Sequence, residues 1–78
     1  MISAHELAMA VVNDRATEAV RKEAVRRMLN GATRDAAAHH LLPTVLAEMI
    51  NPIYEGCEFE NGAWGAALHV LDWELGHE

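Results

Sequence analysis

The stretch from Gly62 to Leu75 constrains this chain most, because it is apolar on two sides of a single helix. At about 100° per residue, large side chains gather on one side, while smaller ones and a tryptophan gather on the other. The first side consists of Trp64, Leu68, Leu71 and Leu75. The second side consists of Ala66, Val70 and Trp73. We expect the first side to face the core of the chain and the second side to be covered by a partner.

The length of 78 residues predicts one domain, residues 1–78, with a small core. A chain of this size buries only about 60–65% of its unfolded surface. Its single cysteine excludes an intramolecular disulfide, and no Cys/His cluster predicts structural zinc. Self-association is the remaining way to support such a core. We therefore predict a homodimer whose interface contains Ala66, Val70 and Trp73.

Apolar residues recur at helical spacing along the chain, which predicts an all-α bundle of about four helices. Ser3 and Glu6 form a capping box for a first helix over about 4–12. Asp14 is a good N-cap for a second helix over about 15–29. Asn30 and Gly31 end that helix, since glycine adopts the left-handed conformation that closes helices.

A third helix is expected from the N-cap Thr33 to Asn51, and it contains Pro43. Because Pro43 lies opposite the apolar face, we predict one helix kinked at Pro43 rather than two separate helices. The periodicity fails from Ile53 to Gly62, where glutamates alternate with aromatic residues and cysteine. This segment predicts an acidic loop, with the last helix beginning near Ala63.

The net charge of −6 is distributed unevenly along the chain. All six basic residues lie between Arg15 and Arg34, and residues 35–78 contain eight carboxylates without any Lys or Arg. Such an acidic body repels nucleic acid and membrane surfaces and favours basic partners. Neither a signal peptide nor a membrane span is predicted, so we expect a cytoplasmic protein.

The candidate catalytic and metal-binding residues do not form a recognised site. His39 and His40 are adjacent and diverge on a helix, while His69 and Asp72 lack a second pair of ligands. Cys57 is surrounded by glutamates, which oppose thiolate formation. We therefore predict no enzyme activity, no metal and no cofactor.

The two central helices and the turn between them have the outline of a helix-turn-helix. A DNA-binding regulator is the alternative interpretation, with a set of basic residues contacting phosphates: Arg15, Lys22, Arg26, Arg27 and Arg34. Three alanines and Asp35 occupy the start of the second of these helices, where basic and amide side chains are needed. Nucleic-acid binding is therefore the less favoured interpretation.

A non-catalytic interaction module, an inhibitor or adaptor that binds a basic surface of a larger nucleic-acid-handling protein, is the favoured function. Its expected partner-binding carboxylates are Glu55, Glu58, Glu60, Glu74 and Glu78. In size, acidity and lack of catalytic motifs, the chain resembles the small inhibitors that phages deploy against host nucleic-acid machinery, including anti-CRISPR proteins. This resemblance is one of composition and rests on no motif.

Overall fold

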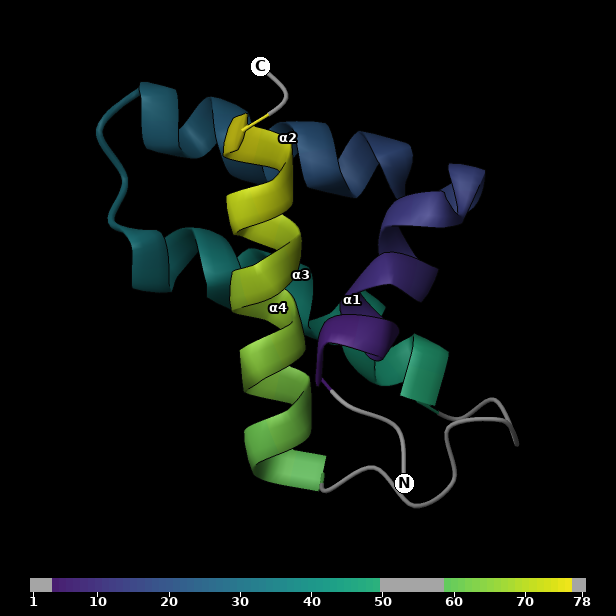
Figure 1. Ribbon diagram of the computed structural model, residues 1–78. Helices are drawn as coiled ribbons and strands as arrows, with labels where there is room; N and C mark the ends of the chain where they lie inside the picture. The colour runs from purple at the N-terminus through teal and green to yellow at the C-terminus, as the bar shows by residue number, and fades with distance from the viewer. Residues whose placement is uncertain (1–3, 50–58, 77–78) are drawn as a thin grey trace.

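The computed structural model describes residues 4–49 and 59–76, which form four α-helices and one short 3-10 turn without any strand. In chain order the elements are α1 (Ala4–Asn13), η1 (Arg15–Thr17), α2 (Glu18–Leu29), α3 (Arg34–Met49) and α4 (Phe59–Gly76). In Figure 1, α4 crosses in front of α2 and α3, and it contacts all three other α-helices. The predicted all-α bundle is confirmed, with α4 as the helix that joins the others.

Local signals in the sequence determine where the helices begin and end. Asp14 Oδ1 accepts a hydrogen bond from the Ala16 N–H at 3.0 Å, and Thr33 Oγ1 accepts one from the Ala36 N–H at 3.1 Å. Gly31 has a φ of 102°, and the N–H of Ala32 donates to the carbonyl of Arg27 at 2.8 Å, which completes a Schellman motif. The cap at Thr33 and the helix end at Gly31 are as predicted. Asp14 caps the 3-10 turn η1, so α2 begins at Glu18 and not at Arg15 as predicted. Ser3 of the expected capping box lies outside the described residues.

The proline in α3 is tolerated within one continuous helix. Pro43 is exposed, while Leu41 and Val45 on either side of it are fully buried. The ring therefore faces solvent, where water can satisfy the carbonyl that loses its helical partner. The prediction of a single helix through Pro43 is confirmed.

α4 begins earlier than the sequence predicted. Residues 59–62 are helical, so their assignment to the loop before Ala63 is wrong. Asn61 and Gly62 indicated a turn, yet each disfavours a helix by only about 1 kcal/mol or less. Ala63, the next residue, is 1% exposed in the core, and its burial favours a helix here over the weak local preference. The rest of the predicted loop, residues 53–58, lies outside the described residues.

The core of the bundle is built from small side chains, since half of its fourteen buried apolar residues are alanines. Small side chains allow helix axes to approach closely. The larger members come from every helix, with Leu7 and Val11 on α1, Val25 on α2, Leu41 on α3 and Leu71 on α4. The described core is therefore thin and closely packed, and α4 contributes five of its fourteen residues.

A polar network connects the end of α1 to α2 and α4. Thr17 is 6% exposed, and its hydroxyl donates to the carbonyl of Val11 at 2.6 Å. Arg21 Nε donates to Thr17 Oγ1 at 2.9 Å, and the guanidinium also pairs with Glu74. The network satisfies the buried hydroxyl and fixes the C-terminal part of α4 against α2.

Candidate functional site

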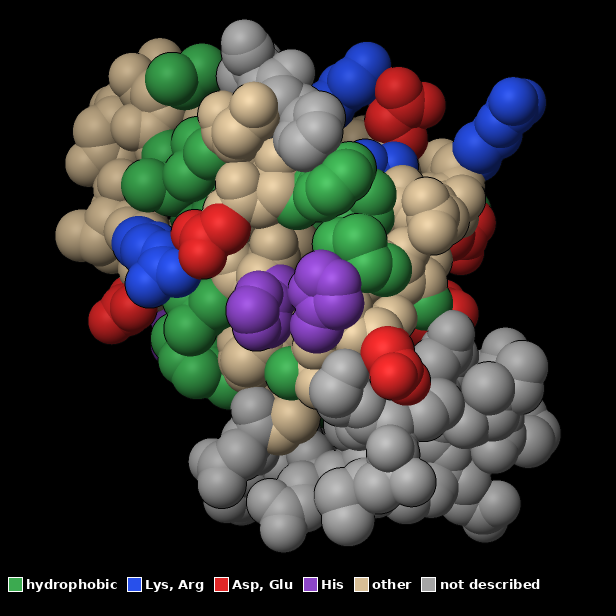
Figure 2. Space-filling model, viewed as in Figure 1, with side chains coloured by type: hydrophobic (Ala, Val, Ile, Leu, Met, Phe, Trp, Pro, Cys, Tyr) green, Lys and Arg blue, Asp and Glu red, His purple; other side chains and the backbone are tan. Residues whose placement is uncertain are grey.

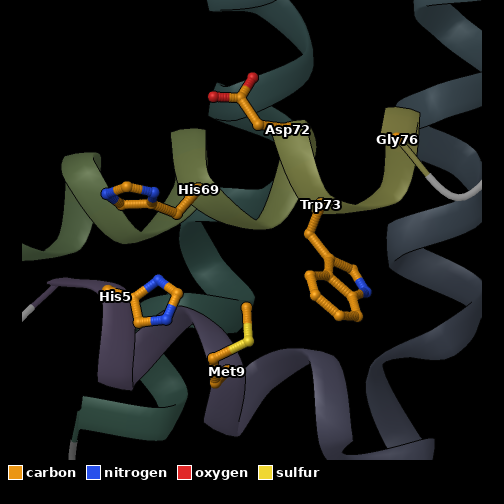
Figure 3. Close-up of a pocket in the computed structure, with 6 residues that line it drawn as sticks. All are labelled: His5, Met9, His69, Asp72, Trp73 and Gly76. Atoms are coloured by element: carbon orange, nitrogen blue, oxygen red, sulfur yellow. The ribbon is translucent and has the colours of Figure 1, made fainter.

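A groove lies between α1 and α4 in the described part of the chain. It is open to solvent and encloses about 320 Å³. Figure 3 shows its six lining residues, which are His5, Met9, His69, Asp72, Trp73 and Gly76. Two come from α1 and four from the C-terminal half of α4. The groove therefore exists only when the first and last helices are packed together.

Two pairs of side chains, one pair on each helix, face each other across the groove. His5 and Met9 lie one turn apart on α1, and His69 and Trp73 lie one turn apart on α4. The two imidazole rings lie edge to face, with their centroids 5.8 Å apart and their planes at 84°. Figure 2 shows two histidine side chains side by side on this face of the molecule. The groove thus has an imidazole end and an apolar end formed by Met9 and Trp73.

A close approach of the two helices positions the histidines. A Cβ added to Gly65 would lie 3.3 Å from the Cβ of Ala4, which is tighter than ordinary van der Waals contact. Ala4 immediately precedes His5, and Gly65 lies one turn before His69. The absence of a side chain at Gly65 therefore lets the helices meet where the imidazoles face each other.

Trp73 lies at the surface of the groove and is 39% exposed. Tryptophan and methionine are both enriched in protein interfaces, where they supply large and adaptable contact area. The sequence analysis predicts that Trp73 contacts a partner, and the exposure of this side chain is compatible with that role. The dimer itself stays a prediction.

Ala66 and Val70 require a correction, because both are fully buried within the chain. Neither exposes surface in the single chain, so of the three residues predicted at a dimer interface only Trp73 offers surface to a second molecule. Trp64 and Leu68, expected on the core side, are only half-buried. Leu71, also expected on the core side, is fully buried, so the centre of the bundle takes residues from both apolar sides of α4.

The predicted acidic partner-binding surface is described only at Glu74. This carboxylate pairs with Arg21, and both side chains are 12% exposed. Glu74 therefore holds α4 to α2, and its role in partner binding stays a prediction. Glu55, Glu58 and Glu78 lie outside the described residues, and Glu60 lies in the first turn of α4 without a described side chain.

The basic residues of the alternative interpretation are mostly paired with carboxylates of the same chain. Lys22 contacts Glu18 at 3.0 Å, and the Arg34 guanidinium contacts Asp72 at 2.8 Å. Both Arg26 and Arg27 contact Glu23, at 2.6 and 3.1 Å. Arg15, the fifth member, lies exposed in the 3-10 turn before α2.

These contacts change the acidity of two carboxyl groups on the outer surface of α2. A hydrogen bond from Lys22, reinforced by its charge, lowers the pKa of Glu18 below the ordinary value. Hydrogen bonds from Arg26 and Arg27 lower the pKa of Glu23 in the same way. Both carboxylates are therefore held in the charged form by their neighbours.

His39 and His40 lie on α3, away from the groove. The ring of His39 packs against Trp64 with centroids 4.9 Å apart and planes at 54°. His40 has a buried Nε2 atom for which the described residues supply no hydrogen-bond partner. Cys57, the candidate nucleophile, lies outside the described residues.

Residues 4–49 and 59–76 contain neither a membrane-spanning helix nor a cluster of the usual metal ligands. No helix there combines the length and the apolar character needed to cross a membrane. No group of three or more His, Cys, Asp or Glu side chains in these ranges is arranged to hold a metal ion.

Sequence reasoning did not bring the lining residues of the groove together. His5, Met9 and His69 are ordinary positions on separate helices until α1 packs against α4. The one local signal was the one-turn spacing of His5 with Met9 and of His69 with Trp73, which puts each pair on one helix face. No sequence signal indicated that the two faces meet.

No known protein family, curated protein or solved structure matches this chain. The function is therefore argued from the chemistry of the chain itself.

Proposed function

We propose that the protein is a non-catalytic interaction module, an inhibitor or adaptor that binds a basic surface on a larger nucleic-acid-handling protein in the cytoplasm. The observation that supports this proposal is the use of the basic residues. Five of the six Lys and Arg side chains pair with four carboxylates of the chain itself. The positive charge is thus largely neutralised within the fold.

The remaining formal charge is strongly negative. The chain has 12 carboxylates against six Lys and Arg side chains, and the described residues include carboxylates outside these ion pairs. Asp14 and Asp35 are exposed among them. A surface of this sign accelerates encounter with basic partners and opposes contact with phosphates. By sequence, the predicted partner-binding residues Glu55, Glu58 and Glu60 add to this negative charge.

The groove adds an apolar anchor to the acidic surface. Trp73 and Met9 offer contact area at one end, where a partner side chain can lose contact with water. Interfaces of this kind combine a small number of buried anchors with a charged surround that steers and orients the partner. Self-association through Trp73 belongs to the same proposal, with the groove of one chain receiving the tryptophan of another.

The structure supports the alternative, a DNA-binding regulator, less well than it supports a protein-binding module. α2, the turn at Gly31 and α3 have the expected order, but Ala37, Ala38 and Leu41 of α3 are buried in the bundle. Arg34, the basic residue at the start of α3, pairs with Asp72 of α4. A recognition helix presents this part of its surface to the major groove. The ion pairs therefore favour a protein partner over DNA.

Affinity purification from the native host, with mass spectrometry, tests the proposal. Wild-type bait should recover a basic nucleic-acid-handling protein, and recovery should fall as salt is raised. Reversing the charge of three predicted partner-binding carboxylates, with Glu55→Lys, Glu58→Lys and Glu60→Lys together, should reduce recovery strongly. A single Trp73→Ser change should reduce it by removal of the anchor without altering charge. Equal recovery by wild type and the charge-reversed bait would overturn the acidic docking surface.

Two controls separate the alternatives. A gel-shift series with duplex DNA should give no complex, whereas a complex that weakens steeply with salt would support the DNA-binding interpretation. Light scattering of wild type and Trp73→Ser measures the oligomeric state. A monomer in both cases would exclude the dimer without affecting binding to a different partner.

A further inference from the structure

Three soft or borderline metal ligands line the same groove. His5 and His69 contribute imidazole nitrogens from opposite helices, and Met9 contributes a thioether one turn along α1 from His5. Figure 3 shows the Met9 side chain extending toward α4 between His5 and Trp73. We propose that His5, His69 and Met9 form a binding site for copper(I). This site goes beyond the proposed partner-binding function and does not depend on it.

The separation of the imidazoles suits a shared ion. A metal bound at about 2.0–2.1 Å from a histidine nitrogen lies about 3 Å from the ring centre, so two rings about 6 Å apart can share it. The observed centroids are 5.8 Å apart. Both histidines are exposed, so their rings turn from the edge-on contact without displacing core residues.

The chemistry of the ligands favours copper(I). Thioether sulfur is a soft ligand that selects copper(I), and imidazole binds copper as well as harder ions. Asp72, the carboxylate in the groove, is paired with Arg34, and Figure 3 shows it pointing away from the two histidines. A hard ion that prefers oxygen ligands therefore gains little here.

The helices hold the ligands in register. Gly65 of α4 lies close to Ala4 of α1, the residue before His5, and a Cβ added at Gly65 would be 3.3 Å from the Ala4 Cβ. Met9 packs against the core cluster, and Val70, the residue after His69, is fully buried. The backbone on both sides of the groove is thus positioned before an ion binds, and only side-chain rotation is needed.

Copper(I) titration of the untagged full chain, without oxygen and against a chromophoric chelator, tests the site. We expect one ion per chain, and His5→Gln, His69→Gln and Met9→Leu should each weaken affinity by at least about tenfold, because loss of a direct ligand exceeds a second-shell effect. His39→Gln and Met28→Leu are matched controls outside the groove and should bind like wild type. Circular dichroism checks that every variant keeps its helices.

Two further measurements make the outcome decisive. Cys57→Ser removes the one thiol of the chain and should leave the affinity unchanged, whereas loss of binding in this variant alone would overturn the site. Nickel(II) titration should depend on His5 and His69 but not on Met9, since nickel(II) prefers nitrogen to thioether. Copper(I) binding that is absent, or that is unaffected by all three groove substitutions, would also overturn the proposal.

Discussion

The inner surface of α4 and the outer surface of α2 use their side chains in opposite ways. On α4, Val70 and Leu71 are fully buried, and Glu74 reaches across to Arg21 of α2. On the outside of α2, charged residues pair with neighbours one turn away, and Leu29 is 71% exposed. Contacts of α4 connect elements far apart in sequence, whereas those on the outside of α2 are local. Stability should therefore depend on α4 and tolerate change on α2.

Leu71→Ala should have the largest effect. Removing a fully buried leucine leaves a cavity in a thin core, which should lower the free energy of unfolding by about 3 kcal/mol. Urea unfolding followed by circular dichroism measures the change. Leu29→Ala on α2 is the matched control and should lie within about 0.5 kcal/mol of wild type. Similar losses in the two variants would contradict the contrast between the helices.

Ala66→Leu tests the corrected orientation of α4. The larger side chain has no room among the buried residues, so overpacking should lower the free energy of unfolding by about 2 kcal/mol. Ala19→Leu makes the same change at an exposed position of α2 and should be nearly neutral. Unfolding curves and light scattering together distinguish the cases. A stable Ala66→Leu protein with an altered oligomeric state would instead restore Ala66 to a dimer interface.

Helix ends that carry a local cap or stop signal were predictable, unlike the start of α4, which lies earlier than predicted. Asp14 and Thr33 cap backbone N–H groups within three residues, and Gly31 adopts its left-handed conformation irrespective of distant packing. Pro43 lies opposite the apolar stripe of α3, so one uninterrupted helix followed from the wheel. In each case the helix is favoured by contacts between residues that are close together in the sequence.

The face of α4 was not predictable in the same way, because both of its sides are apolar. The choice between them depends on how closely the other helices approach, and the small side chains of Ala66 and Ala67 permit the tighter packing. The groove depends on the same approach, since His5 and His69 are 64 positions apart and meet only after α1 and α4 pack. Helical periodicity describes one helix and carries no information on its neighbour.

Glu74→Gln should weaken the link between α4 and α2. The change removes the charge from a largely buried ion pair and leaves Arg21 without its carboxylate, which should cost about 2 kcal/mol. A double-mutant cycle with Arg21→Gln isolates the coupling between the two side chains. The control is Glu18→Gln, whose ion pair with Lys22 is exposed and should contribute much less. Additive effects of Glu74→Gln and Arg21→Gln would show that the pair is not a stabilising link.

Acidification should remove the contribution of the outer α2 ion pairs, and this is the smallest expected effect. The pKa values of Glu18 and Glu23 are lowered in the folded chain by hydrogen bonds from Lys22 and from Arg26 and Arg27. A carboxyl with a lower pKa when folded stabilises the fold above its unfolded pKa, and this stabilisation is lost as pH falls through the folded pKa. Urea midpoints at neutral pH and at about pH 3 should therefore differ less in a Glu18→Gln, Glu23→Gln double variant than in wild type. An equal difference in both proteins would show that these exposed pairs contribute nothing, which would sharpen the contrast with Glu74.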